Sequence, residues 1–286
     1  MSNPTLLGLT LTNEEYHKDT SRISKSGLDL VNKSPLHYHY KYLDPSRKAE
    51  REKEWAVTGT AVGMALAEPD AFREKYAAID DAEIVEEIGG ARPRSTAKYG
   101  EWMKEQTAEL AGKTIITLDE YNQWVAMNDA ARRNKAVRFL LADKEGQAER
   151  TFYYNDPGTG VACRVRPDWL AVFNGWIVDI KTTVDASPGS FSRSIAKFRY
   201  HVQDPFYTDG LKFNGFDAKG FAFIVVEKTP PYPTAVYFLP KEAKQQGRLE
   251  IRRNLDDYAL ALKTGIWAGY VNDQLHEINL PPWAFK

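Results

Sequence analysis

Residues 166–183 decide the fold class, and they read Arg-Pro-Asp-Trp-Leu-Ala-Val-Phe-Asn-Gly-Trp-Ile-Val-Asp-Ile-Lys-Thr-Thr. Apolar and polar residues alternate on both sides of the Asn-Gly pair, and Asn-Gly is typical of hairpin turns. The pattern predicts two neighbouring strands, one within 161–172 and one within 176–183. Asp168 is then expected on the first strand, alongside Asp179 on the second.

The second strand places its charged residues on one face. Side chains alternate along a strand, so Asp179 and Lys181 point the same way and Ile180 points into the core. Two carboxylates are hard ligands suited to Mg²⁺, with Mn²⁺ as an alternative, and the carbonyl of Ile180 is a further expected ligand. A lysine beside them positions an attacking water or stabilises charge on a phosphate. The alternative is an ordinary surface ion pair at the end of a hairpin.

A predicted helix at 190–213 follows, and it carries two more candidate residues. Gln203 and Tyr207 are four residues apart, so they share one helix face. A glutamine is able to orient the attacking water, and a tyrosine hydroxyl is able to hold a phosphate. The alternative for Tyr207 is a place in the hydrophobic core.

Four basic residues near this segment are candidate DNA contacts. Arg164 and Arg166 lie on the first predicted strand, where they either clamp phosphate or face solvent. Lys197 and Arg199 precede Gln203, and we expect them to contact phosphate, which positions DNA without reading its sequence.

The rest of the chain predicts an α/β domain with a mixed sheet flanked by helices. The almost wholly apolar segment 220–227 is typical of a central strand buried on both faces. We expect one domain over 1–286, with a mainly helical part at 1–145, a catalytic sheet core at 146–240, and a C-terminal helix and tail at 241–286. Further strands are predicted at 149–154 and 234–239, a loop at 68–100, and helices at 55–67, 98–111, 118–142 and 240–264 and between Ser24 and Pro35.

Composition limits the kinds of site. The chain has 43% hydrophobic and 27% charged residues, which is typical of a globular domain, and its net charge is -1. Its one cysteine excludes an internal disulfide and a cysteine-rich zinc or iron–sulfur site, which leaves an oxygen-ligated metal. A DNA-binding surface on so neutral a chain requires clustered cations. No apolar stretch is long enough to span a membrane, so we expect a cytoplasmic protein of a bacterium or phage-infected host cell.

Three segments resemble a known nuclease family. They are Arg-Pro-Asp-Trp at 166–169, Val-Asp-Ile-Lys-Thr-Thr at 178–183 and Phe-Arg-Tyr-His-Val-Gln-Asp-Pro-Phe-Tyr-Thr-Asp-Gly-Leu at 198–211. Together they resemble the exodeoxyribonuclease VIII (RecE-like) PD-(D/E)xK exonuclease family, including the Q-x-x-x-Y helix of RecB-like nucleases. Segments 22–28, 58–70 and 265–270 are also similar to that family, so the resemblance covers nearly the whole chain.

The resemblance implies a restriction-endonuclease-like core and a function. It implies Mg²⁺-dependent, 5′-to-3′ digestion of linear double-stranded DNA by a ring-shaped homo-oligomer such as a tetramer. It also implies a single-strand annealing protein as partner in phage-type recombination. By position, Asp168 and Asp179 would be metal ligands, Lys181 the catalytic lysine, and Gln203 and Tyr207 supports for the nucleophile or the DNA.

One position departs from the family pattern. The family's G-T-A-x-H segment ends in a metal-binding histidine, and this chain has Gly63 there. Either another group replaces it, or one ion is held weakly, or the protein is a nuclease-deficient DNA-end-binding or scaffold protein. His37 and His39 are candidate replacements, whereas Glu68 is expected on a different helical face. An endonuclease of the same fold is a further alternative.

Overall fold

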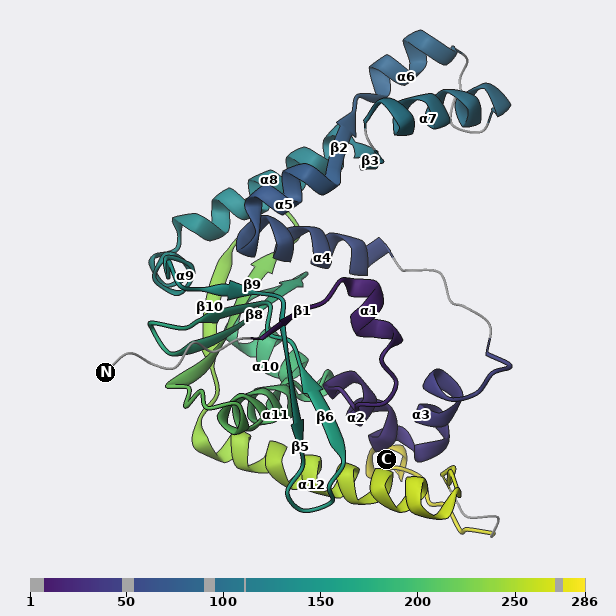
Figure 1. Ribbon diagram of the computed structural model, residues 1–286, viewed down its shortest axis with the longest axis vertical. Coiled ribbons are helices and arrows are strands. Elements are labelled where there is room, and N and C mark those ends of the chain that lie inside the picture. The colour runs from purple at the N-terminus through teal and green to yellow at the C-terminus, as the bar shows by residue number, and fades with distance from the viewer. Residues whose placement is uncertain (1–7, 48–53, 90–95, 111, 271–274, 286) are drawn as a thin grey trace.

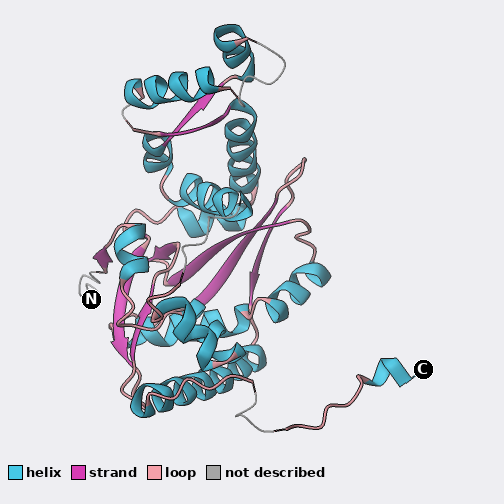
Figure 2. Cartoon of the chain, turned by 90° about the vertical axis from the view of Figure 1, so that its right-hand side faces the viewer, coloured by secondary structure: helices cyan, strands magenta, loops and turns pink. Residues whose placement is uncertain are grey.

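The computed structural model describes residues 8–47, 54–89, 96–110, 112–270 and 275–285 (Figure 1). A mixed sheet forms the centre of the body, helices cover both of its faces, and an arm of helices projects from one end (Figures 1 and 2). The α/β class predicted from the sequence is therefore confirmed. No helix in the described ranges is both long enough and apolar enough to cross a membrane.

The main sheet, within the described residues, has five strands in the order β10-β9-β8-β7-β4. Strands β8 and β9 run parallel and the other pairs run antiparallel, so the sheet is mixed as predicted. The strands are β4 (Gln147–Ala148), β7 (Trp169–Ala171), β8 (Trp176–Thr183), β9 (Gly220–Glu227) and β10 (Thr234–Phe238).

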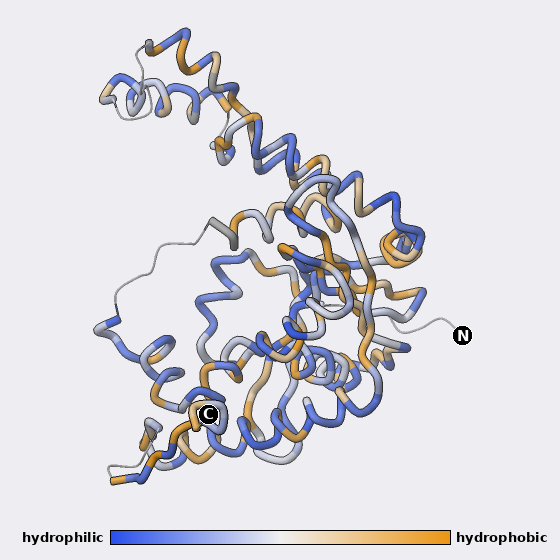
Figure 3. Tube along the Cα trace, turned by 180° about the vertical axis from the view of Figure 1, so that it is seen from behind, coloured by the Kyte–Doolittle hydropathy of each residue, from blue (hydrophilic) through white to orange (hydrophobic). Residues whose placement is uncertain are grey.

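Alternation along β9 builds two hydrophobic cores, one on each face of the sheet. Phe221, Phe223 and Val225 belong to one buried cluster. Ala222 and Ile224, with Val226 beyond them, belong to the other. The prediction of a strand buried on both faces is confirmed, and Figure 3 shows the apolar segments gathered in the body of the molecule.

The helices divide between the two faces. The first face is covered by α2 (Lys25–Lys33), α3 (Pro35–Tyr42), α10 (Pro188–Lys197), α11 (Tyr200–Phe213) and α12 (Lys241–Thr264). The second face is covered by α4 (Glu54–Ala67), α8 (Leu118–Arg133) and α9 (Lys135–Leu141). The prediction of one helix at 190–213 is wrong, because the segment forms two helices. Arg199 has a left-handed φ of 54° and separates α10 from α11.

The predicted strand at 161–172 is also wrong as a single element. It forms β6 (Ala162–Val165) and β7, which lie in different sheets. Pro167 lies between them and has no N–H to donate to a ladder, so the chain leaves one sheet there and enters the other. The smaller sheet has the order β1-β5-β6, with β1 (Leu9–Thr10) and β5 (Arg150–Asn155).

The predicted loop at 68–100 is wrong, because much of it is helix and strand. Strand β2 (Tyr76–Ile79) pairs in parallel with β3 (Thr114–Thr117) within the arm. Each strand is too short to show a periodic pattern, and its partner lies far away in the sequence. The arm also contains α5 (Pro69–Lys75), α6 (Asp81–Ile88) and α7 (Ala97–Glu109). The remaining elements are α1 (Asn13–Lys18) and η2 (Pro282–Phe285).

Candidate active site

The hairpin from β7 to β8 brings the two predicted aspartates together. Asp168 directly precedes β7, and Trp169 pairs with Val178 in the antiparallel ladder. The Oδ2 atom of Asp168 accepts a hydrogen bond from the backbone N–H of Ile180 at 2.6 Å. Because the N–H and C=O of one strand residue point to the same side, the carbonyl of Ile180 faces the Asp168 edge of β8. The connection at 172–175 is longer than a two-residue turn, and Gly175 supplies its positive φ of 79°.

Lys181 reaches back to the second aspartate along its own strand. Its Nζ lies 2.5 Å from Oδ2 of Asp179. Burial by itself lowers the pKa of Lys181, but the charges of Asp179 and Asp168 outweigh it and raise the pKa to about 12. The lysine is therefore a protonated donor near neutral pH.

The site lies in a pocket of about 1030 Å³. It is lined by Asp168 and the middle of β8, by the start of α2, by small residues of α4, and by the face of α11 that carries Gln203 and Tyr207. Seven of the residues predicted from the sequence line the pocket: Arg166, Asp168, Asp179, Ile180, Lys181, Gln203 and Tyr207.

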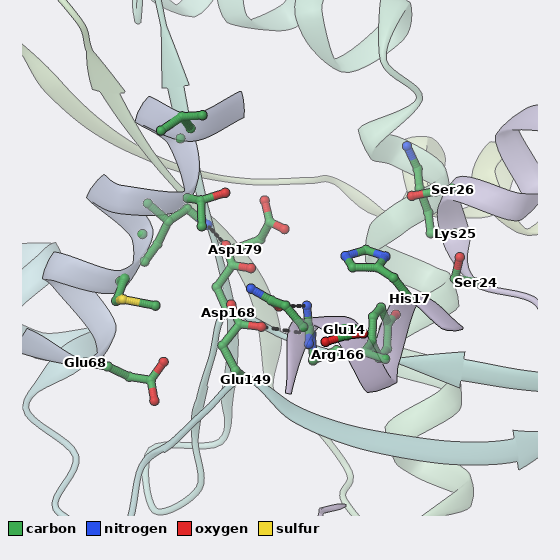
Figure 4. A pocket seen from close by; sticks show the side chains of 18 of the residues that line it. Glu14, His17, Ser24, Lys25, Ser26, Glu68, Glu149, Arg166, Asp168 and Asp179 are labelled. Atoms are coloured by element: carbon green, nitrogen blue, oxygen red, sulfur yellow. Dashed lines mark hydrogen bonds and ion pairs between the residues drawn. The ribbon is translucent and has the colours of Figure 1, made fainter. Parts of the chain in front are cut away.

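Three further acidic residues line the same pocket, namely Glu14, Glu68 and Glu149. Glu149 lies one residue before β5, has a left-handed φ of 48°, and donates its N–H to the carbonyl of Asp168. Glu68 begins α5 and approaches from the arm side. Figure 4 shows Asp179, Asp168 and Glu149 along one wall, with Glu68 to one side. Glu149 was not among the residues predicted from the sequence, because its left-handed backbone conformation, which is common at functional positions, is visible only in the structure.

Crowding of carboxylates raises their pKa values. Burial and the charges of Asp179 and Glu149 raise the pKa of Asp168 well above its usual range. Burial also raises the pKa of Glu149 to about 7; Arg166 opposes this shift, and Glu68 and Asp179 add to it. A divalent cation relieves such like-charge repulsion, so the donor set suits one.

The coordination expected here is incomplete without solvent or substrate. Apart from the contact with Lys181, Oδ2 of Asp179 lacks a hydrogen-bond partner among the described residues. Within the same residues, no three His, Cys, Asp or Glu side chains converge closely enough to form a ready-made metal cage. A hard divalent cation is often held by one or two carboxylates plus waters and substrate phosphate, so the residues present fit a divalent cation.

The helix α11 supports the second aspartate. Nε2 of Gln203 donates to Oδ1 of Asp179 at 2.5 Å, so the glutamine orients this carboxylate in the structure. Tyr207 is one turn further along, lines the pocket and is 9% exposed. Burial raises the pKa of Tyr207 well above its usual range, so its hydroxyl stays protonated.

The four predicted phosphate contacts divide into two groups. Arg166 lines the pocket and pairs with Glu149 at 2.8 Å. Arg164 is 3% exposed, donates to the carbonyl of Tyr16 and packs on its ring, so it anchors α1 and is not available to DNA. Arg199 is occupied by Asp29, Glu250 and Asn254, and neither it nor Lys197 lines the pocket.

Position 63 opens onto the pocket. A Cβ atom built on Gly63 meets nothing within 4 Å, so a side chain there would point into free space. The candidate replacements His37 and His39 lie elsewhere, since His37 contacts Ser34 and His39 packs against Trp267. Glu68 lies just beyond the end of α4, and it lines the same pocket as Gly63.

Comparison with known proteins gives a matching family model and solved structures of similar fold. The family model of the PDDEXK-like domain of unknown function (DUF3799) matches residues 24–273. The crystal structure of a "Putative exonuclease" from Eubacterium rectale has a TM-score of 0.60 at 13% identity, covering 97% of this chain and 98% of its own. At that identity the likeness shows the fold alone.

A more distant overlap carries no argument. An alkaline exonuclease from Laribacter hongkongensis has a TM-score of 0.29 at 12% identity, over 66% of this chain and 92% of its own. The curated proteins give no match. Because the family model spans residues 24–273, which is most of the chain, the protein belongs to the PDDEXK-like family described as DUF3799.

Proposed function

We propose that the protein is a metal-dependent nuclease that digests linear double-stranded DNA from its ends. The observation that carries the proposal is the juxtaposition of Asp168, Asp179 and Lys181 in one pocket. The exonuclease description of the Eubacterium rectale structure supports digestion from an end.

The residues of the chain have distinct tasks in phosphodiester hydrolysis. A divalent cation held by Asp168, Asp179 and the carbonyl of Ile180 would polarise the phosphate and lower the pKa of water. Lys181 stays protonated, so it donates to the phosphate as negative charge develops there and does not act as a base. Gln203 keeps the Asp179 carboxylate in its orientation.

Finer details follow from the resemblance to exodeoxyribonuclease VIII. They are Mg²⁺ as the ion, 5′-to-3′ polarity, a ring-shaped homo-oligomer and a single-strand annealing partner in phage-type recombination. Substrates labelled at the 5′ or 3′ end test the polarity, and sedimentation of the full chain tests the ring. Release of the 3′ label first contradicts the polarity, and a monomer contradicts the ring.

A nuclease-deficient DNA-end binder is the second candidate. The favouring observation is Gly63, which leaves space but no ligand at a position where the exodeoxyribonuclease VIII family, which the chain resembles, has a histidine. Glu68 and Glu149 favour the active enzyme instead, because they supply further carboxylates to the pocket that position 63 also lines.

The test uses end-labelled linear duplex and a closed circular duplex, each with Mg²⁺ and with chelator. The proposal expects loss of the linear form only, dependence on the cation, and loss of activity in Asp179→Asn. Asp217→Asn is the matched control, since Asp217 is an exposed surface aspartate. Cleavage of the circle favours an endonuclease, and binding without cleavage favours the deficient form.

A further inference from the structure

Tyr200 presents its ring to the ammonium group of Lys181. The Nζ atom lies 4.7 Å from the centre of the ring. The face of an aromatic ring carries partial negative charge and attracts a cation at this distance. Lys181 therefore has two partners of different kinds, the Asp179 carboxylate and an uncharged aromatic face.

We propose that Tyr200 is a positioning residue for Lys181, an inference that rests on the proposed nuclease function. A lysine has a flexible stem, so its ion pair alone fixes it only while the carboxylate is free. A divalent cation at Asp179 competes for the oxygen that Lys181 contacts. The face of the Tyr200 ring has no oxygen with which to bind the divalent cation. It therefore retains the ammonium group of Lys181 close to the phosphate while Asp179 is occupied by the ion.

The ring of Tyr200 packs among other aromatic rings. It stacks on Phe198 and Phe223, with both ring centres 5.7 Å away, and it lies 5.9 Å from the ring of Phe191. Phe223 belongs to the buried central strand β9, so the Tyr200 ring that contacts Lys181 packs directly on the core of the sheet.

Tyr200 also begins α11, directly after the left-handed Arg199. The guanidinium of Arg199 bonds Asp29 on α2 and Glu250 on α12, which joins both helices to this corner. Lys25, at the start of α2, donates to the carbonyl of Phe198 at 2.7 Å. The corner between α10 and α11 is thereby fixed from two sides, and the position of the Tyr200 ring with it.

A purely structural role for Tyr200 predicts different behaviour. A packing residue lowers stability when truncated, and any loss of activity follows the loss of folded protein. A positioning residue lowers kcat in the folded protein while DNA binding, and so KM, changes little. Tyr200→Phe keeps the ring face and removes only the hydroxyl group, so it shows whether the hydroxyl contributes to either role.

The test compares Tyr200→Phe and Tyr200→Leu with the unmutated chain, and uses Phe213→Leu as a matched loss of one aromatic ring at an exposed site. With Mg²⁺ and linear duplex, we expect Tyr200→Phe and Phe213→Leu to retain kcat. Tyr200→Leu is expected to lose about tenfold or more in kcat with little change in KM. A folded Tyr200→Leu variant with unchanged kcat overturns the proposal.

A second readout does not need activity. Ring currents of Tyr200 shift the ε-methylene proton signals of Lys181 upfield, and Lys181→Met assigns these signals by their loss. We expect the shift in the unmutated protein and in Tyr200→Phe, both with and without Mg²⁺. Absence of the shift in the unmutated protein, or its loss when Mg²⁺ is added, overturns the inference. Absence of cleavage in the unmutated protein with the shift present contradicts the nuclease function and leaves the contact established.

Discussion

The carboxylate of Asp168 accepts a hydrogen bond from the backbone N–H of Ile180, so the first aspartate is fixed to the strand that carries the second. This contact joins the start of β7 to the middle of β8 and aligns Asp168 with Asp179. It uses one oxygen of Asp168, and the residue also lines the pocket. The hairpin therefore determines the site geometry before any ligand binds.

Asp168→Asn is expected to stabilise the metal-free protein while abolishing cleavage. The amide oxygen still accepts from Ile180, and the substitution removes a crowded negative charge beside Asp179 and Glu149. We expect the Tm without metal to rise by about 2–4 °C. Differential scanning calorimetry with chelator measures it, and a lower Tm would argue that Asp168 is not under like-charge repulsion.

Stability without metal is expected to fall as pH rises from about 4.5 to about 7. The pKa of Glu149 is raised from 4.5 to about 7 on folding, chiefly by burial, so the folded state binds more protons than the unfolded state in that window. The stabilising contribution of the proton on Glu149 is fully present below pH 4.5 and is lost as the pH rises through about 7. The side chain of Glu149 remains 40% exposed, so solvent weakens the effect.

Thermal melts across this window, with chelator and with Mg²⁺, check the prediction. Glu149→Gln is expected to flatten the slope, whereas the exposed control Glu83→Gln keeps it. Stabilisation by Mg²⁺ is expected to grow with pH, since the ion binds the deprotonated carboxylates. An unchanged slope in Glu149→Gln rules out Glu149 as its source.

Gly63→His is expected to increase affinity for the divalent cation. Position 63 faces free space in the pocket, so an imidazole fits there without displacing α4. Gly63→Ala is the matched control, because it supplies no ligand and stabilises the helix by about 0.5–1 kcal/mol. Titration of cleavage rate with Mg²⁺ compares them. Equal midpoints in the two variants would mean that this position has no bearing on the ion.

Arg164 and Arg166 are expected to behave differently when replaced by methionine. Arg164 is buried against Tyr16, so Arg164→Met is expected to cost about 2–4 kcal/mol of stability. Arg166 lines the pocket, so Arg166→Met is expected to lower the dependence of DNA affinity on salt by about one unit of slope. Binding measured at several salt concentrations distinguishes them, and a reduced slope in Arg164→Met would restore it as a phosphate contact.

The sequence predicted what depends on local alternation and missed what depends on distant partners. The hairpin, the shared face of Asp179 and Lys181, and the doubly buried strand at 220–227 follow from side chains within a few residues of one another. The pairing of β2 with β3 joins segments separated by two helices, and neither segment is periodic by itself.

The site shows the same division. Gln203 shares a pocket with Asp179 as its helix position suggested, although its bond goes to the carboxylate itself. Glu149 reaches the pocket through a left-handed backbone conformation that composition does not reveal. Arg164 appeared available on a strand face, but α1 covers it through contacts between segments far apart in the chain.

We expect one divalent cation to bind between Asp168 and Asp179. The most direct measurement is a crystal structure of the full chain soaked with Mn²⁺, with anomalous scattering used to locate the ion. We predict a peak about 2.0–2.3 Å from carboxylate oxygens of both aspartates, near the carbonyl of Ile180. A peak elsewhere, or none at a Mn²⁺ concentration that supports cleavage, would mean that the two aspartates do not share the catalytic ion.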